Sequence, residues 1–259
     1  MKYLIVHLNT LQTSFEFELL ATSNDDPLLK LLSIKGAANR DKCRTMLAKF
    51  FDRTIERIKK EQEEYGLQET SLPEGIAVIT RARFSDDHYG LKEGKVQIQA
   101  LGDWKRSMAP PSIFEFILTL LIRQAASFAT ESVSRSQHLG TKGCLFDFTA
   151  DLTDVRYKVL QSFVCKACRR RLQEGGALHV LDDMLRVLDM SWLGKVEDPY
   201  SPSGIVAKLG YNLFLTQGIK PSKWEIVQGL LRDEGIKEIV KLISALVLAG
   251  LLFWLGWKK

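Results

Sequence analysis

Three of the chain's four cysteines lie near a histidine, in a pattern typical of a metal site. Cys165 and Cys168 are separated by two residues, a spacing that lets both thiolates bind one metal where the backbone turns tightly. A predicted helix over residues 152–163 would bring this pair back to His138 and Cys144. Because four protein ligands fill a tetrahedron, the pattern predicts a structural zinc ion with no position left for water or substrate. The alternative is that Cys144 is a buried core thiol and that the pair is incidental.

Basic side chains follow this pair directly and form the densest positive cluster of the chain. They are Lys166, Arg169, Arg170 and Arg171. Planar guanidinium groups match phosphate oxygens, so the cluster predicts an anionic signalling ligand or a lipid headgroup. The alternative is a solvated helix face without a ligand. The net charge of +5 suits an anionic membrane surface but is far below that of a dedicated nucleic-acid binder, so nucleic acid is not an expected partner.

The segment with these residues resembles part of a known group of proteins. Its motif is His138, then GCLFDF over residues 143–148, then the CxxC pair. Over residues 138–172 the chain is similar to a poorly characterised group of prokaryotic proteins found near defence genes. The resemblance implies that the histidine and the three cysteines named above are metal ligands, and it implies no reaction.

The periodicity of apolar residues predicts an α+β fold with a small sheet and several helices. Short apolar or alternating runs predict strands over residues 2–8, 14–20, 75–80 and 96–101. Helical spacing predicts helices over residues 27–36, 41–65, 113–128, 152–163, 177–193, 204–215 and 222–231. Asp26 is the expected N-cap of the first helix, and Ser112 with Glu115 forms a capping box. The helix over residues 113–128 is apolar almost all round and is the expected centre of the core.

The most apolar stretch of the chain covers residues 242–257 and contains no charge. A helix of that length spans roughly 24 Å, somewhat less than the ~30 Å of bilayer hydrocarbon, and residues 239–241 extend it. Trp254 and Trp257 stand where an interfacial aromatic belt would place them. The stretch therefore predicts a single C-terminal transmembrane helix. The alternative is a helix buried in the protein core.

The first eight residues do not form a signal peptide, because they contain no small-residue cleavage site. We therefore expect a single-pass protein of the cell inner membrane, anchored by its tail, with its bulk on the cytoplasmic side. The predicted parts are an α/β part (1–135), a zinc-binding helical part (136–198), membrane-proximal helices (199–237) and the membrane anchor (238–259).

Local signatures of enzymes are missing from the sequence, including phosphate-binding loops, the nucleophile elbow and the HExxH helix. No catalytic or cofactor-binding residue is assigned. The leading hypothesis is a membrane-anchored effector or signalling protein of bacterial antiviral defence, which contacts lipid and acts by assembly of its anchor, as a homo-oligomer or with a defence partner. Small residues at 244, 245, 249, 250 and 256 would let anchors pack closely, although membrane helices commonly contain them. The alternatives are a membrane-recruited hydrolase, using Cys43, His88 or His138, and a passive tether for a complex.

Overall fold

The computed structural model describes residues 2–20, 25–33, 36–66, 71–102, 104, 112–134, 138, 143–149, 152, 163–211 and 213. These residues belong to a compact unit, Met1–Gly218, and a second unit comprises Ile219–Lys259. The described part combines helices with small sheets, which confirms the predicted α+β class. The predicted division at residues 135, 198 and 237 stays a prediction.

A three-stranded sheet lies at the centre of the N-terminal half of the unit. Its middle strand, β5 (Val96–Ala100), pairs in parallel with β2 (Ile76–Thr80) and antiparallel with β4 (Gly90–Glu93). β2 and β5 confirm two predicted strands. β4 falls in a segment for which no strand is predicted, and only one of its four residues, Leu91, is buried. A strand so short and polar has no apolar periodicity to detect.

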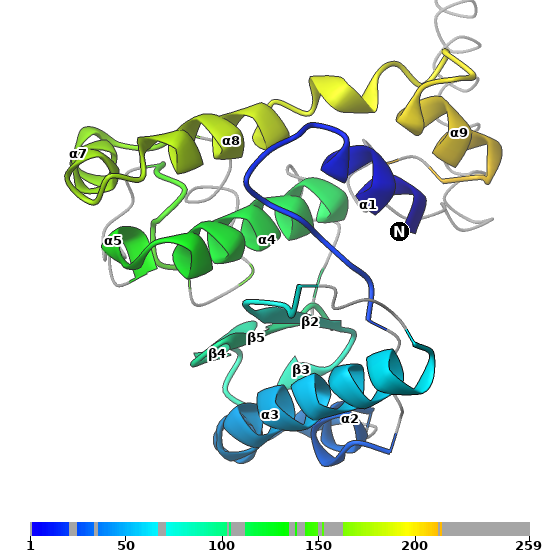
Figure 1. Ribbon diagram of the computed structural model, residues 1–259, viewed down its shortest axis with the longest axis vertical. Coiled ribbons are helices and arrows are strands. Elements are labelled where there is room, and N and C mark those ends of the chain that lie inside the picture. Colours follow the sequence, from blue (N-terminus) through cyan, green and yellow to red (C-terminus); the bar gives the residue numbers. More distant parts are fainter. Residues whose placement is uncertain are drawn as a thin grey trace, which may run out of the picture. The chain divides into compact units, whose positions relative to one another are not determined.

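Two helices lie on one side of this sheet (Figure 1). Their apolar residues form one buried cluster with Leu91 and Ile98 of the sheet. α2 (Pro27–Ser33) follows Asp26, whose side chain accepts from the Leu28 amide at 2.8 Å, as predicted. α3 (Arg40–Glu64) confirms the predicted long helix and is capped by Asn39. The same side includes the short parallel pair β1 (Ala37–Ala38) and β3 (Arg83–Phe84).

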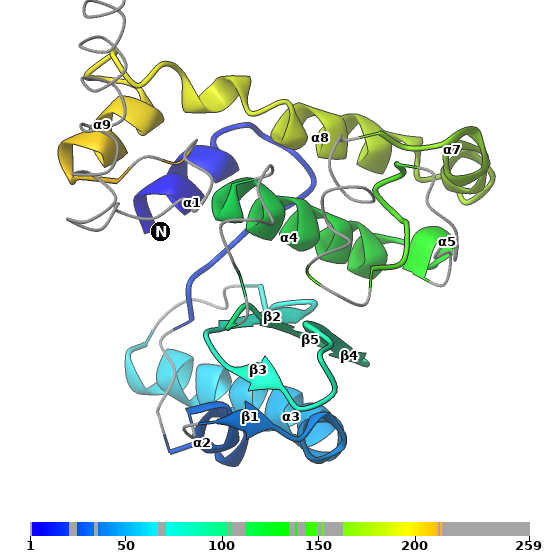
Figure 2. The same cartoon turned by 180° about the vertical axis from the view of Figure 1, so that it is seen from behind.

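Helix α4 (Ile113–Ala129) packs against the other side of the sheet and contributes to two clusters of buried apolar residues. Its predicted capping box is present: Ser112 Oγ accepts from the Glu115 amide at 3.1 Å, and Glu115 Oε2 accepts from the Ser112 amide at 2.6 Å. α8 (Leu178–Leu188) lies beside α4 in both views (Figures 1 and 2). The short helices α5 (Glu131–Ser134) and α7 (Lys166–Glu174) pack at one end of this pair.

The predicted helix over residues 177–193 is shorter than expected. α8 ends at Leu188, because Met190 adopts a left-handed backbone conformation with φ 57°, and a separate 3-10 turn, Ser191–Leu193, follows. α9 (Pro202–Lys208) starts at the Ser201 N-cap and ends well before residue 215, the predicted end. Each of these helices is shorter than predicted because residues interrupt it. The spacing of apolar residues around those positions still matches a helix.

The two strands predicted at the N-terminus are wrong. Residues 2–8 belong to helix α1 (Lys2–Asn9), in which Leu4 and Leu8 are buried four residues apart on one face. Residues 14–20 form no strand. Side chains satisfy part of this backbone instead, since Asn9 bonds both the amide and the carbonyl of Phe17, and Asp183 accepts from the Ser14 amide. A short apolar run alone does not separate helix from strand.

Several predicted segments lie outside the described residues. They are most of the helix over 152–163, the helix over 222–231 and the membrane anchor over 238–259. Among the helices that the structure does describe, none is long and apolar enough to cross a membrane.

Replacing Ser112 with alanine removes one half of the capping box of α4. We expect the free energy of unfolding to fall by about 1 kcal/mol, because the amides of the first turn lose a buried acceptor. Urea unfolding followed by circular dichroism measures the change. Ser33→Ala, at an exposed position in α2, is the control and should change stability by less than about 0.5 kcal/mol. Equal stability of the two variants would contradict the capping role.

Candidate metal centre

The histidine and three cysteines singled out in the sequence meet at one point in the structure. The ligand atoms of His138, Cys144, Cys165 and Cys168 all lie within 4.8 Å of one another. Cys144 and Cys168 are fully buried, whereas His138 and Cys165 are partly buried. A buried set of one imidazole and three thiols could hold a metal ion, as the spacing predicted.

The distances between the ligand atoms are close to the edges of a coordination tetrahedron. Nε2 of His138 lies 3.1 Å from Sγ of Cys168 and 3.2 Å from Sγ of Cys165. The Cys144 and Cys168 sulfurs are 4.0 Å apart. Zinc bond lengths would give edges of about 3.8 Å between two sulfurs and about 3.5 Å between nitrogen and sulfur. The three distances differ from these edges by a few tenths of an ångström, and the 4.8 Å within which the whole set lies exceeds them by about 1 Å.

Backbone hydrogen bonds hold the histidine against the loop that contains Cys144. The His138 amide donates to the Phe146 carbonyl at 3.1 Å, and the Phe148 amide donates to the His138 carbonyl at 2.8 Å. These bonds form an isolated parallel bridge between His138 and Asp147. These bonds hold His138 beside the loop that contains Cys144.

The first turn of α7 supplies the other two ligands. Cys165 is the N-cap of this helix, and its side chain makes no capping bond. Cys168 follows within the first turn and points to the same centre. The Leu145 amide donates to the Phe163 carbonyl at 2.7 Å, which ties the start of α7 to the Cys144 loop. The partial positive charge at a helix N-terminus favours thiolates at such positions.

The hydrogen bond between two of the cysteines shifts their pKa values in opposite directions. It lowers the pKa of the Cys144 thiol and raises the pKa of Cys168. The pair therefore favours a thiolate on one sulfur and a proton on the other. A metal cation would displace that proton and bind both sulfurs as thiolates.

A buried carboxylate and an arginine support the Cys144 loop from behind. Asp147 is fully buried, and its Oδ2 accepts from the Cys144 amide at 3.1 Å. Arg123 of α4 donates from Nη1 to the Asp147 carbonyl oxygen at 2.9 Å. Sequence reasoning assigned no such role to Arg123. An arginine in an otherwise apolar helix is the signal that could have indicated it, because a buried charge requires partners.

The predicted anion-binding cluster lies on α7, next to the metal ligands. All four side chains of the cluster are exposed, namely Lys166, Arg169, Arg170 and Arg171. Arg169 Nε donates to the Val164 carbonyl at 2.9 Å. The cluster is therefore a solvated helix face. One of its side chains bonds a backbone carbonyl just before the helix. An anionic ligand at this cluster stays a prediction.

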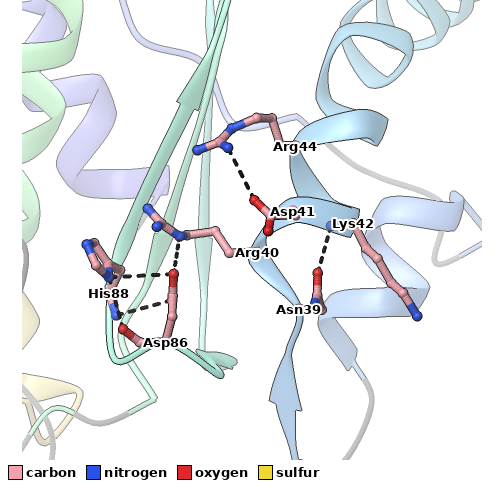
Figure 3. A network of polar contacts seen from close by, with 7 residues as sticks. All are labelled: Asn39, Arg40, Asp41, Lys42, Arg44, Asp86 and His88. Atoms are coloured by element: carbon pink, nitrogen blue, oxygen red, sulfur yellow. Dashed lines mark hydrogen bonds and ion pairs between the residues drawn. The ribbon is translucent and has the colours of Figure 1, made fainter.

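The other candidate residues lie apart from the cysteine cluster. Cys43 is fully buried in the apolar core beside α3, and burial raises the pKa of its thiol, which disfavours a nucleophilic role. His88 belongs to a surface network drawn in Figure 3, in which its Nδ1 lies 2.9 Å from the Asp86 carbonyl oxygen. The Asp86 carboxylate also pairs with Arg40 (Figure 3).

Comparisons with models of protein families, with curated proteins and with solved structures find no match to this chain. The resemblance of residues 138–172 to defence-associated proteins therefore stays a prediction.

Replacing Cys168 with alanine should remove most bound metal from the purified protein. The Cys168 sulfur lies next to the ligand atoms of both His138 and Cys144, and the variant lacks it. The wild-type chain should contain about one equivalent of metal, as expected for a single tetrahedral site. Elemental analysis of protein purified without chelators measures both values. Cys43→Ala is the matched control, since this cysteine lies in a different core cluster. Metal content that is equally low in both variants, or negligible in the wild type, would contradict the site.

Proposed function

We propose that His138, Cys144, Cys165 and Cys168 bind a zinc ion with a structural role. The donor set supports zinc, because three thiolates and one imidazole form a common tetrahedral zinc site. It also supports a structural role, because all four positions are filled by protein and none remains for a reacting water. The single observation that carries this proposal is the convergence of the four ligand atoms within 4.8 Å.

The zinc ion would join two segments of the chain. The histidine and the Cys144 loop form one bonded pair, and the first turn of α7 forms the other side of the site. Apolar residues of α4, α7 and α8 pack around the site, including Leu118, Leu172 and Met184. Binding of the ion would thus stabilise the helical part of the unit.

We further infer that the chain is a membrane-anchored effector or signalling protein that acts by association and not by metal catalysis. The uncharged stretch over residues 242–257 supports the anchor. The filled ligand set of the metal site supports a role in binding over one in catalysis. The protein would lie in the inner membrane, with its body on the cytoplasmic side, and would work as a homo-oligomer or with a defence partner.

Substitution of cobalt(II) for the bound ion tests the identity of the site. A tetrahedral thiolate site should give intense visible absorption, and added zinc should displace the cobalt because it binds such sites more tightly. Removal of the metal by a chelator should lower the melting temperature, and readdition of zinc should restore it. Cys43→Ala is expected to behave like the wild type. An unchanged melting temperature after complete metal removal would contradict the structural role.

Deletion of residues 239–259 tests the membrane proposal. We expect the full chain in the membrane fraction after an alkaline carbonate wash, and the deleted chain in the soluble fraction. Leu248→Arg should weaken insertion, because an arginine at the centre of a membrane helix costs roughly 3 kcal/mol. Any toxicity of the expressed protein should disappear with the anchor.

Metal content of the deleted chain serves as the control for folding, since all four metal ligands are retained. Recovery of the intact chain in the soluble fraction would contradict membrane anchoring. Toxicity that persists in the deleted chain would contradict an effect through the membrane helix.

A further inference from the structure

A cavity of about 180 Å³ lies between the sheet and helix α4, on the side away from α3. Strands β4 and β5 form one wall, and α4 forms another. Phe146, Phe148 and Thr149, from the loop that also contains Cys144, close a third side. This volume is smaller than the ~300 Å³ at which most small-molecule pockets begin, so the cavity suits a single small chemical group.

The polar residues of α4 are concentrated on the face that lines this cavity. Leu120, Arg123, Gln124 and Ser127 stand at positions i, i+3, i+4 and i+7 of an otherwise apolar helix. That spacing places them on one helix face. The Ser127 hydroxyl donates to the Gln124 carbonyl at 2.8 Å, so the side chains on this face that require further acceptors are those of Arg123 and Gln124, because burial of an unpaired polar group is unfavourable.

The facing wall of the sheet is polar as well. Lys92 of β4 and Gln97 of β5 are direct cross-strand neighbours, and both line the cavity. Their neighbours Leu91 and Ile98 point to the opposite side of the sheet and into the apolar core beside α3. The alternation of side chains in the strands therefore gives the sheet one apolar face and one face with amines and amides.

Two positive charges share this space. Lys92 lies at the rim, where its Nζ donates to Ser127 Oγ at 2.9 Å and stands 5.2 Å from the centre of the Phe128 ring. Partial burial and the nearby Arg123 guanidinium lower the pKa of Lys92, and burial lowers that of Arg123. The charge of Asp147 acts in the opposite direction on Arg123 and raises its pKa. The like charges of Lys92 and Arg123 favour an anion near both side chains.

A buried amide provides the second, independent observation. The Gln124 side chain is only 5% exposed, and its Nε2 has no hydrogen-bond partner among the described residues. More than nine in ten buried polar groups in proteins are paired, so an unpaired amide in a cavity wall indicates a missing acceptor. Arg123 has five N–H groups, and one on Nη1 bonds the Asp147 carbonyl as described above.

We propose that this cavity binds a phosphate group, held by the charges of Lys92 and Arg123 and by the amide of Gln124. A phosphate has several acceptor oxygens, which matches walls that present mainly donors. The group is either inorganic phosphate or the terminal phosphate of a nucleotide. This site differs from the exposed basic cluster on α7 and goes beyond the zinc and membrane proposals.

The site shares a structural link with the metal centre. Arg123 contacts the carbonyl of Asp147, and the Asp147 carboxylate accepts from the Cys144 amide. The loop held by the metal ligands also closes the third wall of the cavity. An anion between Lys92 and Arg123 would therefore act on the same loop that the metal fixes.

Isothermal titration calorimetry of inorganic phosphate into the metal-loaded full chain in detergent tests the proposal. We expect saturable binding of one phosphate per chain. Lys92→Gln and Gln124→Leu should each weaken binding about tenfold or more, since each removes a donor to a charged ligand. Adenosine 5′-monophosphate distinguishes the two sources: tighter binding than inorganic phosphate indicates a nucleotide, and equal or weaker binding indicates the free ion.

One lysine variant and one arginine variant provide matched controls. Lys95→Gln removes a lysine from the same hairpin that stands over a different ring, Phe51, and does not line the cavity. Arg170→Gln removes one charge of the α7 cluster. Neither should change phosphate affinity. Absence of saturable binding of both ligands to the wild type, or equal weakening by Lys92→Gln and Lys95→Gln, would overturn the proposal. Should Gln124→Leu fail to fold by circular dichroism, the exposed Lys92 variant decides alone.

Discussion

Buried sulfur atoms are packed closely together in the helical part of this protein. Thiolate charge on such atoms requires a positive charge beside it, and the helical part depends on this interaction. Cys144 and Cys168 are fully buried 4.0 Å apart, and with the two other ligands they form a site at which thiolate charge cannot be solvated by water. The loop geometry, the bridge to His138 and the start of α7 all serve to bring these atoms together. A bound cation satisfies this constraint with one interaction, where apolar packing alone would leave the charge unpaired.

Helix α4 connects this centre to the rest of the unit. Its apolar residues enter two core clusters, and its single arginine, Arg123, reaches the loop of the metal site while lining the cavity beside the sheet. A helix that is almost entirely apolar has no solvent-facing side, so its few polar residues must find partners inside the protein. Arg123 therefore supports the loop of the candidate metal centre and also lines the cavity.

Two errors in the predicted fold concern short segments whose structure depends on tertiary contacts. Short apolar runs contain too few residues to separate a period of 3.6 from a period of 2, and the choice falls to tertiary contacts. Residues 2–8 form a helix because Leu4 and Leu8 pack on one face, with α9 among the neighbours of α1. β4 forms because β5 offers a free edge for pairing, although its own sequence is mostly polar.

The sequence by itself determined the long elements and the residues of the candidate metal centre. α3 and α4 follow from sustained periodicity with recognisable caps. The cluster of one histidine and three cysteines, which could hold a metal ion, follows from residue type and spacing. Only the tertiary structure decided that Lys92 and Gln97 face Arg123 and Gln124 across a cavity. These residues come from a strand pair and a helix far apart in the chain, and no local pattern records which faces of separate elements will meet.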